Sequence, residues 1–80
     1  MKAKIYVTLK NGVLDPQGKV IMSSLFNLGI EGLEDVRVGK YMEVVLKDLG
    51  REEALRLLDD ACRRLIANTV IEDYRIEIEG

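Results

Sequence analysis

The stretch VRVGKYMEVVL, residues 36–46, decides how many strands this chain can place in a sheet. Its apolar side chains alternate with others, the pattern of strands with one buried face: Val36, Val38, Met42, Val44 and Leu46. A three-residue turn at Gly39-Lys40-Tyr41 would keep this alternation through a hairpin, because Val38 would then face Met42. We therefore predict two strands joined at residues 39–41, and one long bent strand is the alternative.

The flanking segments set the rest of the fold. Residues 2–10 and 74–79 alternate apolar and polar side chains, which is typical of strands with one solvated face. Residues 16–28 and 51–66 instead repeat apolar side chains at helical spacing. The order βαββαβ predicts an α+β two-layer sandwich of ferredoxin-like kind, a four-stranded, mainly antiparallel sheet with two helices on one face. We expect a single domain over residues 1–80.

The composition excludes several classes of function. The formal net charge is −2, so no general field attracts nucleic acid or an anionic membrane, and we expect neither as a partner. One cysteine and no histidine exclude an internal disulfide, a multi-cysteine metal site and a CxxC metal carrier. The chain starts with alternation instead of the continuous apolar run of a signal peptide, which predicts a cytoplasmic protein.

The loop in LKNGVLDPQGKVI, residues 9–21, has two interpretations. A turn rich in glycine before a helix can cradle phosphate if several backbone N–H groups are free. Here Pro16 removes one donor, Asp15 places an acid where the anion would lie, and the P-loop motif is absent. We favour the other interpretation, in which Asp15 caps the helix and Pro16 occupies its first position.

Residues able to carry out catalysis are few. Cys62 falls on the apolar side of the second predicted helix, which indicates a core thiol and not a nucleophile. Glu72-Asp73 is the one acidic pair outside the helical and strand patterns, and we interpret it as a solvated strand entry. Tyr6 and Tyr41 could stack on bases, but the acidic residues around them argue against RNA binding. The sequence therefore predicts no catalytic, cofactor-binding or metal-binding residue.

Met22 and Phe26 form an apolar spot of their own. They are adjacent on the first predicted helix but lie roughly 120–170° from the centre of its main apolar arc at 100° per residue. Methionine and aromatic residues are enriched in interface cores. We predict a partner interface that includes this spot and the turn residues Gly39, Lys40 and Tyr41. Burial of the whole helix in its own core is the alternative explanation for the spot.

Three runs in the chain resemble a known family. They are GVLDPQG at 12–18, VGK at 38–40, and LIANTVIEDY at 65–74. Together they resemble the PurS family, the small subunit of phosphoribosylformylglycinamidine synthase, over nearly the whole chain. The family commonly has proline where Thr69 stands here, which should loosen that loop only.

The resemblance implies a role in purine biosynthesis. In such systems formylglycinamide ribonucleotide becomes its amidine with ATP and with ammonia from glutamine. The PurL synthetase subunit is expected to hold ATP and magnesium, and the PurQ glutaminase subunit to hydrolyse glutamine. This chain would be a non-catalytic bridge without a cofactor of its own, and a homo-oligomer, either a dimer or a larger assembly. The alternative is a regulatory domain of ferredoxin-like fold that binds a small ligand such as an amino acid.

Overall fold

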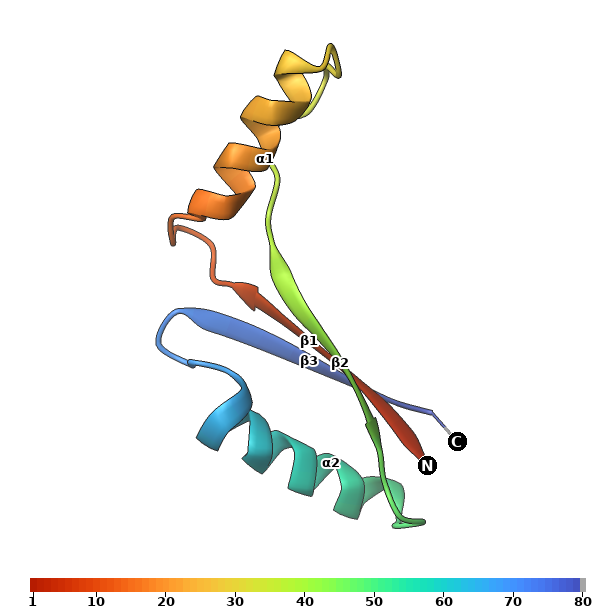
Figure 1. Cartoon of the computed structure of the whole chain (residues 1–80). Helices are drawn as coiled ribbons and strands as arrows, with labels where there is room; N and C mark the ends of the chain where they lie inside the picture. Colours follow the sequence, from red (N-terminus) through yellow and green to blue (C-terminus); the bar gives the residue numbers. More distant parts are fainter. Residues whose placement is uncertain (80) are drawn as a thin grey trace.

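The computed structural model describes residues 1–79 as a small sheet with one helix against it and one helix held away from it (Figure 1). The elements are β1 (Lys2–Leu9), α1 (Pro16–Asn27), β2 (Gly39–Val45), α2 (Arg51–Ala61), the π-helical turn η1 (Cys62–Ile66) and β3 (Glu72–Glu79). The strands predicted at the two ends of the chain and the two predicted helices are confirmed. The second helix ends in a π turn and not in α geometry.

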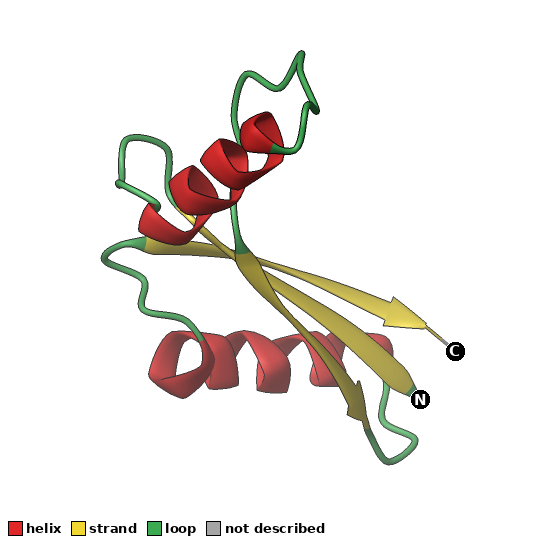
Figure 2. Cartoon of the chain, turned by 45° about the horizontal axis from the view of Figure 1, so that its top comes forward, coloured by secondary structure: helices red, strands yellow, loops and turns green. Residues whose placement is uncertain are grey.

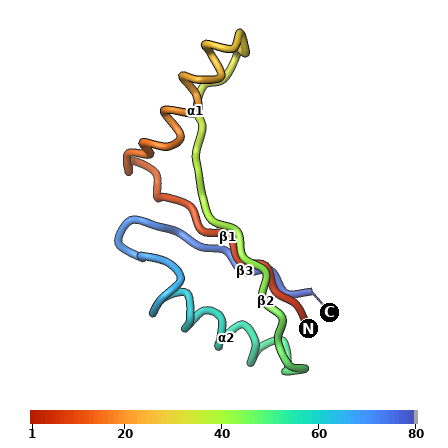
Figure 3. Tube along the Cα trace, in the orientation of Figure 1, coloured from red at the N-terminus to blue at the C-terminus, as the bar shows by residue number. Residues whose placement is uncertain are grey.

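Within the described residues the sheet has three antiparallel strands, in the order β2-β1-β3. The prediction of a four-stranded ferredoxin-like sheet is therefore wrong for this chain. No hairpin forms at 39–41, because Gly39, Lys40 and Tyr41 all pair with β1, opposite Thr8, Val7 and Tyr6. The chain before Gly39 runs on as an extension of β2 beyond the sheet (Figure 3), so the alternative of one long strand is closer to the structure.

The core lies between the sheet and α2. The alternation of β1 places Ala3, Ile5 and Val7 on the face toward this helix, where they are fully buried. Ala54, Leu58 and Cys62 reach this core from the other side at helical spacing. In Figure 2 α2 lies along one side of the sheet. Because this helix packs nearest to β3, side chains of β2 such as Met42 and Val44 are only partly covered. One helix is thus too narrow to cover this face.

The other helix does not join this core. Together α1 and the chain that returns from it form an arm, residues 16–38, which extends past the end of the sheet (Figure 1). The prediction of two helices on one face is therefore also wrong: α1 makes no substantial contact with the sheet or with α2. The radius of gyration is 16.0 Å, whereas a compact domain of this length has about 12 Å.

A tight approach between α1 and the returning chain holds the arm together. Gly18 is buried, and a Cβ atom at this position would lie 2.0 Å from the carbonyl oxygen of Val36. Glycine is otherwise a poor residue inside a helix, where it costs about 1 kcal/mol relative to alanine. Its absent side chain is what lets the helix lie directly on the backbone near Val36.

Gly18→Ala should therefore weaken the arm, against the usual helix propensity. We expect the opening free energy of α1 to fall by about 1–3 kcal/mol, the usual effect of overpacking, measured as faster amide hydrogen exchange within α1. Gly50→Ala is the matched control, because no atom lies within 4 Å of a Cβ placed there. Equal exchange rates in both variants and in the wild type would show that the close approach does not hold the arm.

Candidate partner-binding surfaces

The carboxylate of Asp15 joins the two ends of the arm. One oxygen accepts a hydrogen bond from the Gly18 N–H at 2.9 Å, and the other accepts from the Val38 N–H at 2.7 Å. Asp15 is only 4% exposed. These two donors, with Val38 the stronger influence, hold the pKa of the Asp15 carboxyl below its ordinary value despite burial. The helix cap predicted from the sequence is confirmed.

Hydrogen bonds from a second side chain, Arg37, hold the loop before α1. The guanidinium group of Arg37 donates hydrogen bonds to the carbonyl oxygens of Leu9, Lys10 and Val13. One planar cation therefore satisfies three carbonyls of the loop at once. Asp15 and Arg37 together fix the direction in which the arm leaves the sheet.

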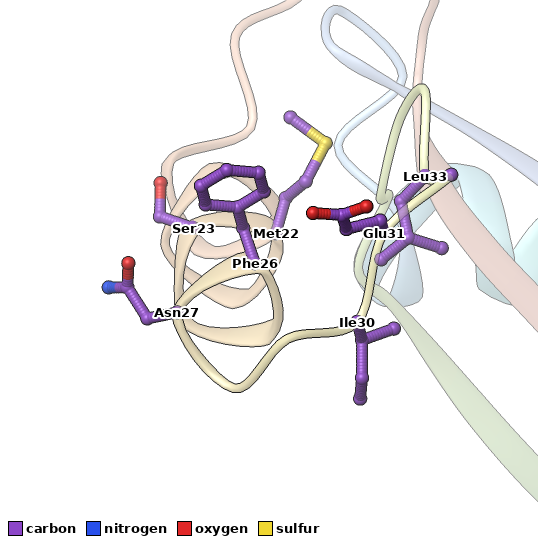
Figure 4. Close-up of a pocket in the computed structure, with 8 residues that line it drawn as sticks. Met22, Ser23, Phe26, Asn27, Ile30, Glu31 and Leu33 are labelled. Carbon is purple, nitrogen blue, oxygen red and sulfur yellow. The ribbon is translucent and has the colours of Figure 1, made fainter.

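The predicted interface residues fall into two groups. Met22 and Phe26 lie on the arm, where they line an open hollow of about 740 Å³ together with Ile30 and Leu33 of the returning chain (Figure 4). Met22 is partly buried, but Phe26 remains 65% exposed. A large aromatic side chain that stays this exposed beside other apolar side chains is characteristic of a protein interaction site.

Gly39, Lys40 and Tyr41 lie apart from that hollow, in the sheet at the start of β2. Gly39 passes close to β1, since a Cβ there would lie 2.5 Å from the Val7 carbonyl oxygen. The ammonium group of Lys40 donates to the Ile66 carbonyl oxygen at 3.2 Å. Gly39 and Lys40 thus connect β2 to its neighbours within the chain.

Tyr41 points to the face of the sheet that α2 does not cover. Its ring lies 5.1 Å from that of Tyr6, its partner across the ladder, and its hydroxyl donates to Glu43. The guanidinium carbon of Arg75 lies 4.2 Å from the centroid of the Tyr6 ring. The hydrogen bond to Glu43 and partial burial raise the pKa of Tyr41. This open face therefore carries a cluster of aromatic and charged side chains that contact one another within the chain.

Glu72 has a larger role than a solvated strand entry. Its carboxylate accepts a hydrogen bond from the Asn68 N–H at 2.7 Å and lies 3.8 Å from the Lys40 ammonium group. It therefore closes the turn before β3 and connects β3 to β2. Sequence reasoning missed the contact of Glu72 with Lys40 and the contacts of Arg37, because contacts between residues far apart in the sequence leave no local pattern.

The thiol of Cys62 is fully buried in the core. Burial, with a smaller effect from Asp59, raises the pKa of this thiol and so disfavours the thiolate that a nucleophile requires. Among residues 1–79 no group of three or more histidine, cysteine, aspartate or glutamate side chains is placed to bind a metal ion. The described part of the chain thus offers surfaces for binding.

Comparisons with known proteins agree with one another. The family described as "PurS: Phosphoribosylformylglycinamidine (FGAM) synthase" matches residues 2–80. The PurS subunit of this synthase from Bacillus subtilis is 46% identical over 78 residues, which cover 98% of this chain and 92% of that protein. The chain belongs to the PurS family.

Solved structures show the same fold. The crystal structure of Bacillus subtilis PurS has a TM-score of 0.87 at 46% identity and covers 99% of this chain and 98% of that one. PurS from Methanocaldococcus jannaschii has a TM-score of 0.89 at 33% identity, over 99% and 95% of the two chains. A chain in the structure of PurLQS from Thermotoga maritima has a TM-score of 0.87 at 28% identity, over 95% and 93%.

The runs that resemble the PurS family meet at the base of the arm. GVLDPQG supplies Asp15 and Gly18, VGK supplies the Val38 N–H and Lys40, and the run at 65–74 supplies Glu72. These residues make the contacts that set the arm relative to the sheet. In this PurS chain the three runs thus serve the geometry of the arm.

The Asp15 contact should make the stability of the arm depend on pH. Because the folded-state pKa is lowered, its contribution is present above the unfolded value near 3.8 and is lost as the pH falls through the lower, folded value. We expect Asp15→Asn to loosen α1 at pH 7, with faster amide exchange.

The difference between Asp15→Asn and the wild type should shrink below about pH 4, where Asp15 of the unfolded chain begins to bind a proton, and should be lost below the lower folded-state pKa. Circular dichroism at 222 nm between pH 7 and pH 2.5 measures the loss of helix in both proteins. Asp48→Asn, in the exposed turn before α2, is the control. A difference that stays constant over this range would contradict the role of the Asp15 charge.

Proposed function

We propose that this chain is a non-catalytic bridge that holds the PurL synthetase and PurQ glutaminase subunits together and so supports the transfer of ammonia between them. The observation that carries the proposal is the arm, which places exposed apolar side chains far from the core of the chain. A chain in the Thermotoga maritima PurLQS structure has the same fold, which supports assembly with these two subunits.

The chemistry of the complex would reside in the larger subunits. We propose that ATP and magnesium bind to PurL and that this chain binds no cofactor. Its one cysteine is buried, and its Asp15 occupies the helix N-terminus that a phosphate group would otherwise approach. The role left to this chain is to position its partners.

The anchor of the interface would be the Met22–Phe26 hollow. Phe26 has the area and the exposure of a residue that becomes buried at the centre of a protein interface. Gly39 and Lys40 would act less directly, since they fix the base of the arm, whereas Tyr41 would present the open face of the sheet.

The remaining parts of the proposal concern organisation. We propose one domain over residues 1–80, self-association into a dimer or a larger assembly, a cytoplasmic location, and no nucleic acid or membrane partner. No helix among residues 1–79 combines the length and the apolar character needed to cross a bilayer. The exposed arm supports self-association, because a small core alone gives modest stability.

Phe26→Ala tests the interface directly. We expect the dissociation constant for the larger subunits to rise roughly 30-fold, which corresponds to about 2 kcal/mol, since hot-spot residues contribute this much. Mass photometry of mixtures with PurL and PurQ measures the assembly, and thermal unfolding checks the fold.

Leu65→Ala is the matched control for that variant, because Leu65 is an apolar side chain that is 86% exposed and lies outside the arm. It should bind like the wild type. If Phe26→Ala instead melts at a much lower temperature but binds normally, Phe26 belongs to the core of the chain. A wild-type chain that binds neither larger subunit would contradict the proposed function itself.

A further inference from the structure

The Met22–Phe26 hollow lies toward the far end of the arm. One wall comes from the second half of α1, and the other comes from the chain that returns after it (Figure 1). Ile30 and Leu33 of the returning chain stay exposed, as Phe26 does. The hollow therefore leaves apolar surface open to solvent at a point where the chain has no core of its own to cover it.

The turn after α1 forms this hollow through backbone contacts. The Ile30 N–H donates to the Leu25 carbonyl oxygen at 3.0 Å, and the Gly29 N–H donates to that of Phe26 at 3.0 Å. This is the Schellman arrangement, and it requires the positive φ that Gly29 adopts, 86°. The returning wall is thus set by the helix end itself, so the hollow is formed before any partner binds.

Glu31 is the one charged residue among those that line the hollow. Figure 4 shows its carboxylate pointing from the returning chain toward Met22 and Phe26. Among residues 1–79 no lysine or arginine forms an ion pair with Glu31. A partner that covers the apolar walls would remove water from this carboxylate, which then needs a cation to replace the lost hydration.

The charge around the hollow has a single sign. Residues 20–36 contain no lysine or arginine but three acidic residues, Glu31, Glu34 and Asp35. This segment carries a formal charge of −3, so the rest of the chain carries +1 of the total of −2. The flanking basic residues, Lys19 and Arg37, line a different hollow at the base of the arm. The outer part of the arm therefore attracts a basic surface and repels an acidic one.

We infer that the hollow accepts a basic amphipathic surface segment of one of the two larger subunits. An apolar side chain of that segment enters the hollow against Phe26, and a lysine or arginine beside it pairs with the Glu31 carboxylate. The apolar contact supplies affinity, whereas the ion pair fixes the register and excludes acidic surfaces. This inference rests on the bridging function proposed above and adds the chemistry by which the arm recognises its partner.

Substitutions of Glu31 test the ion pair. Glu31→Gln keeps the shape of the side chain and removes its charge, and Glu31→Lys reverses the charge. We expect the dissociation constant for the larger subunits, measured by isothermal titration calorimetry, to rise roughly tenfold for the first and roughly 100-fold for the second, because like charges would then meet. Glu31 is exposed in the free chain, so the melting temperature of both variants should match that of the wild type.

Glu52→Lys is the matched control, because it makes the same change in net charge at an exposed position of α2, outside the arm. It should change the dissociation constant by less than about threefold, as surface substitutions do. Equal effects of Glu31→Lys and Glu52→Lys, or tighter binding by Glu31→Lys, would overturn the inference and leave the bridge proposal standing. A wild-type chain that binds neither larger subunit would overturn both.

Discussion

The carboxylate of Asp15 is the contact on which the rest of the structure depends. It joins residues that are 23 positions apart by accepting the Val38 N–H, and it caps α1 through the Gly18 N–H. A buried carboxylate needs such donors, since without them its burial would be costly. Because both donors belong to the arm, this one side chain sets the direction of a helix that has no core of its own to rest on.

The sequence was informative where a pattern is local. The alternation of Ala3, Ile5 and Val7, the cap at Asp15 and the end of α1 before Gly29 all follow from neighbouring residues. The stretch 36–46 was not decisive, since a three-residue turn and a straight strand preserve the same alternation. The choice between them depends on the pairing of residues 39–41 with β1 and on the Asp15–Val38 bond, neither of which the stretch itself contains.

The candidate surfaces were predictable in part for the same reason. Helical spacing identifies Met22 and Phe26 as neighbours, and the structure places both in one hollow. Spacing also finds the apolar arc of α1 that contains Val20 and Ile21, but the structure leaves both side chains exposed. Lys40 and Tyr41 were predicted as a turn and are strand residues on opposite faces of the sheet. The contacts of Arg37 and the contact of Glu72 with Lys40 depend on tertiary structure alone.

An arm without a catalytic group suits a subunit that acts by position. The buried Cys62 stabilises the core, whereas exposed apolar side chains such as Phe26 lie on the arm, which extends away from that core. A bridge of this kind can affect the use of ammonia from glutamine without affecting the chemistry at the synthetase site. It also explains why the runs that resemble the family gather at the base of the arm and not in a cleft.

The central claim is that this chain couples two other subunits and performs no chemistry itself. The most direct measurement compares amidine formation by PurL and PurQ with and without this chain, once with glutamine and once with free ammonia as the nitrogen source. The account predicts that adding the chain raises the glutamine-dependent rate and leaves the ammonia-dependent rate unchanged. An equal rise in both rates, or turnover by the purified chain alone, would contradict it.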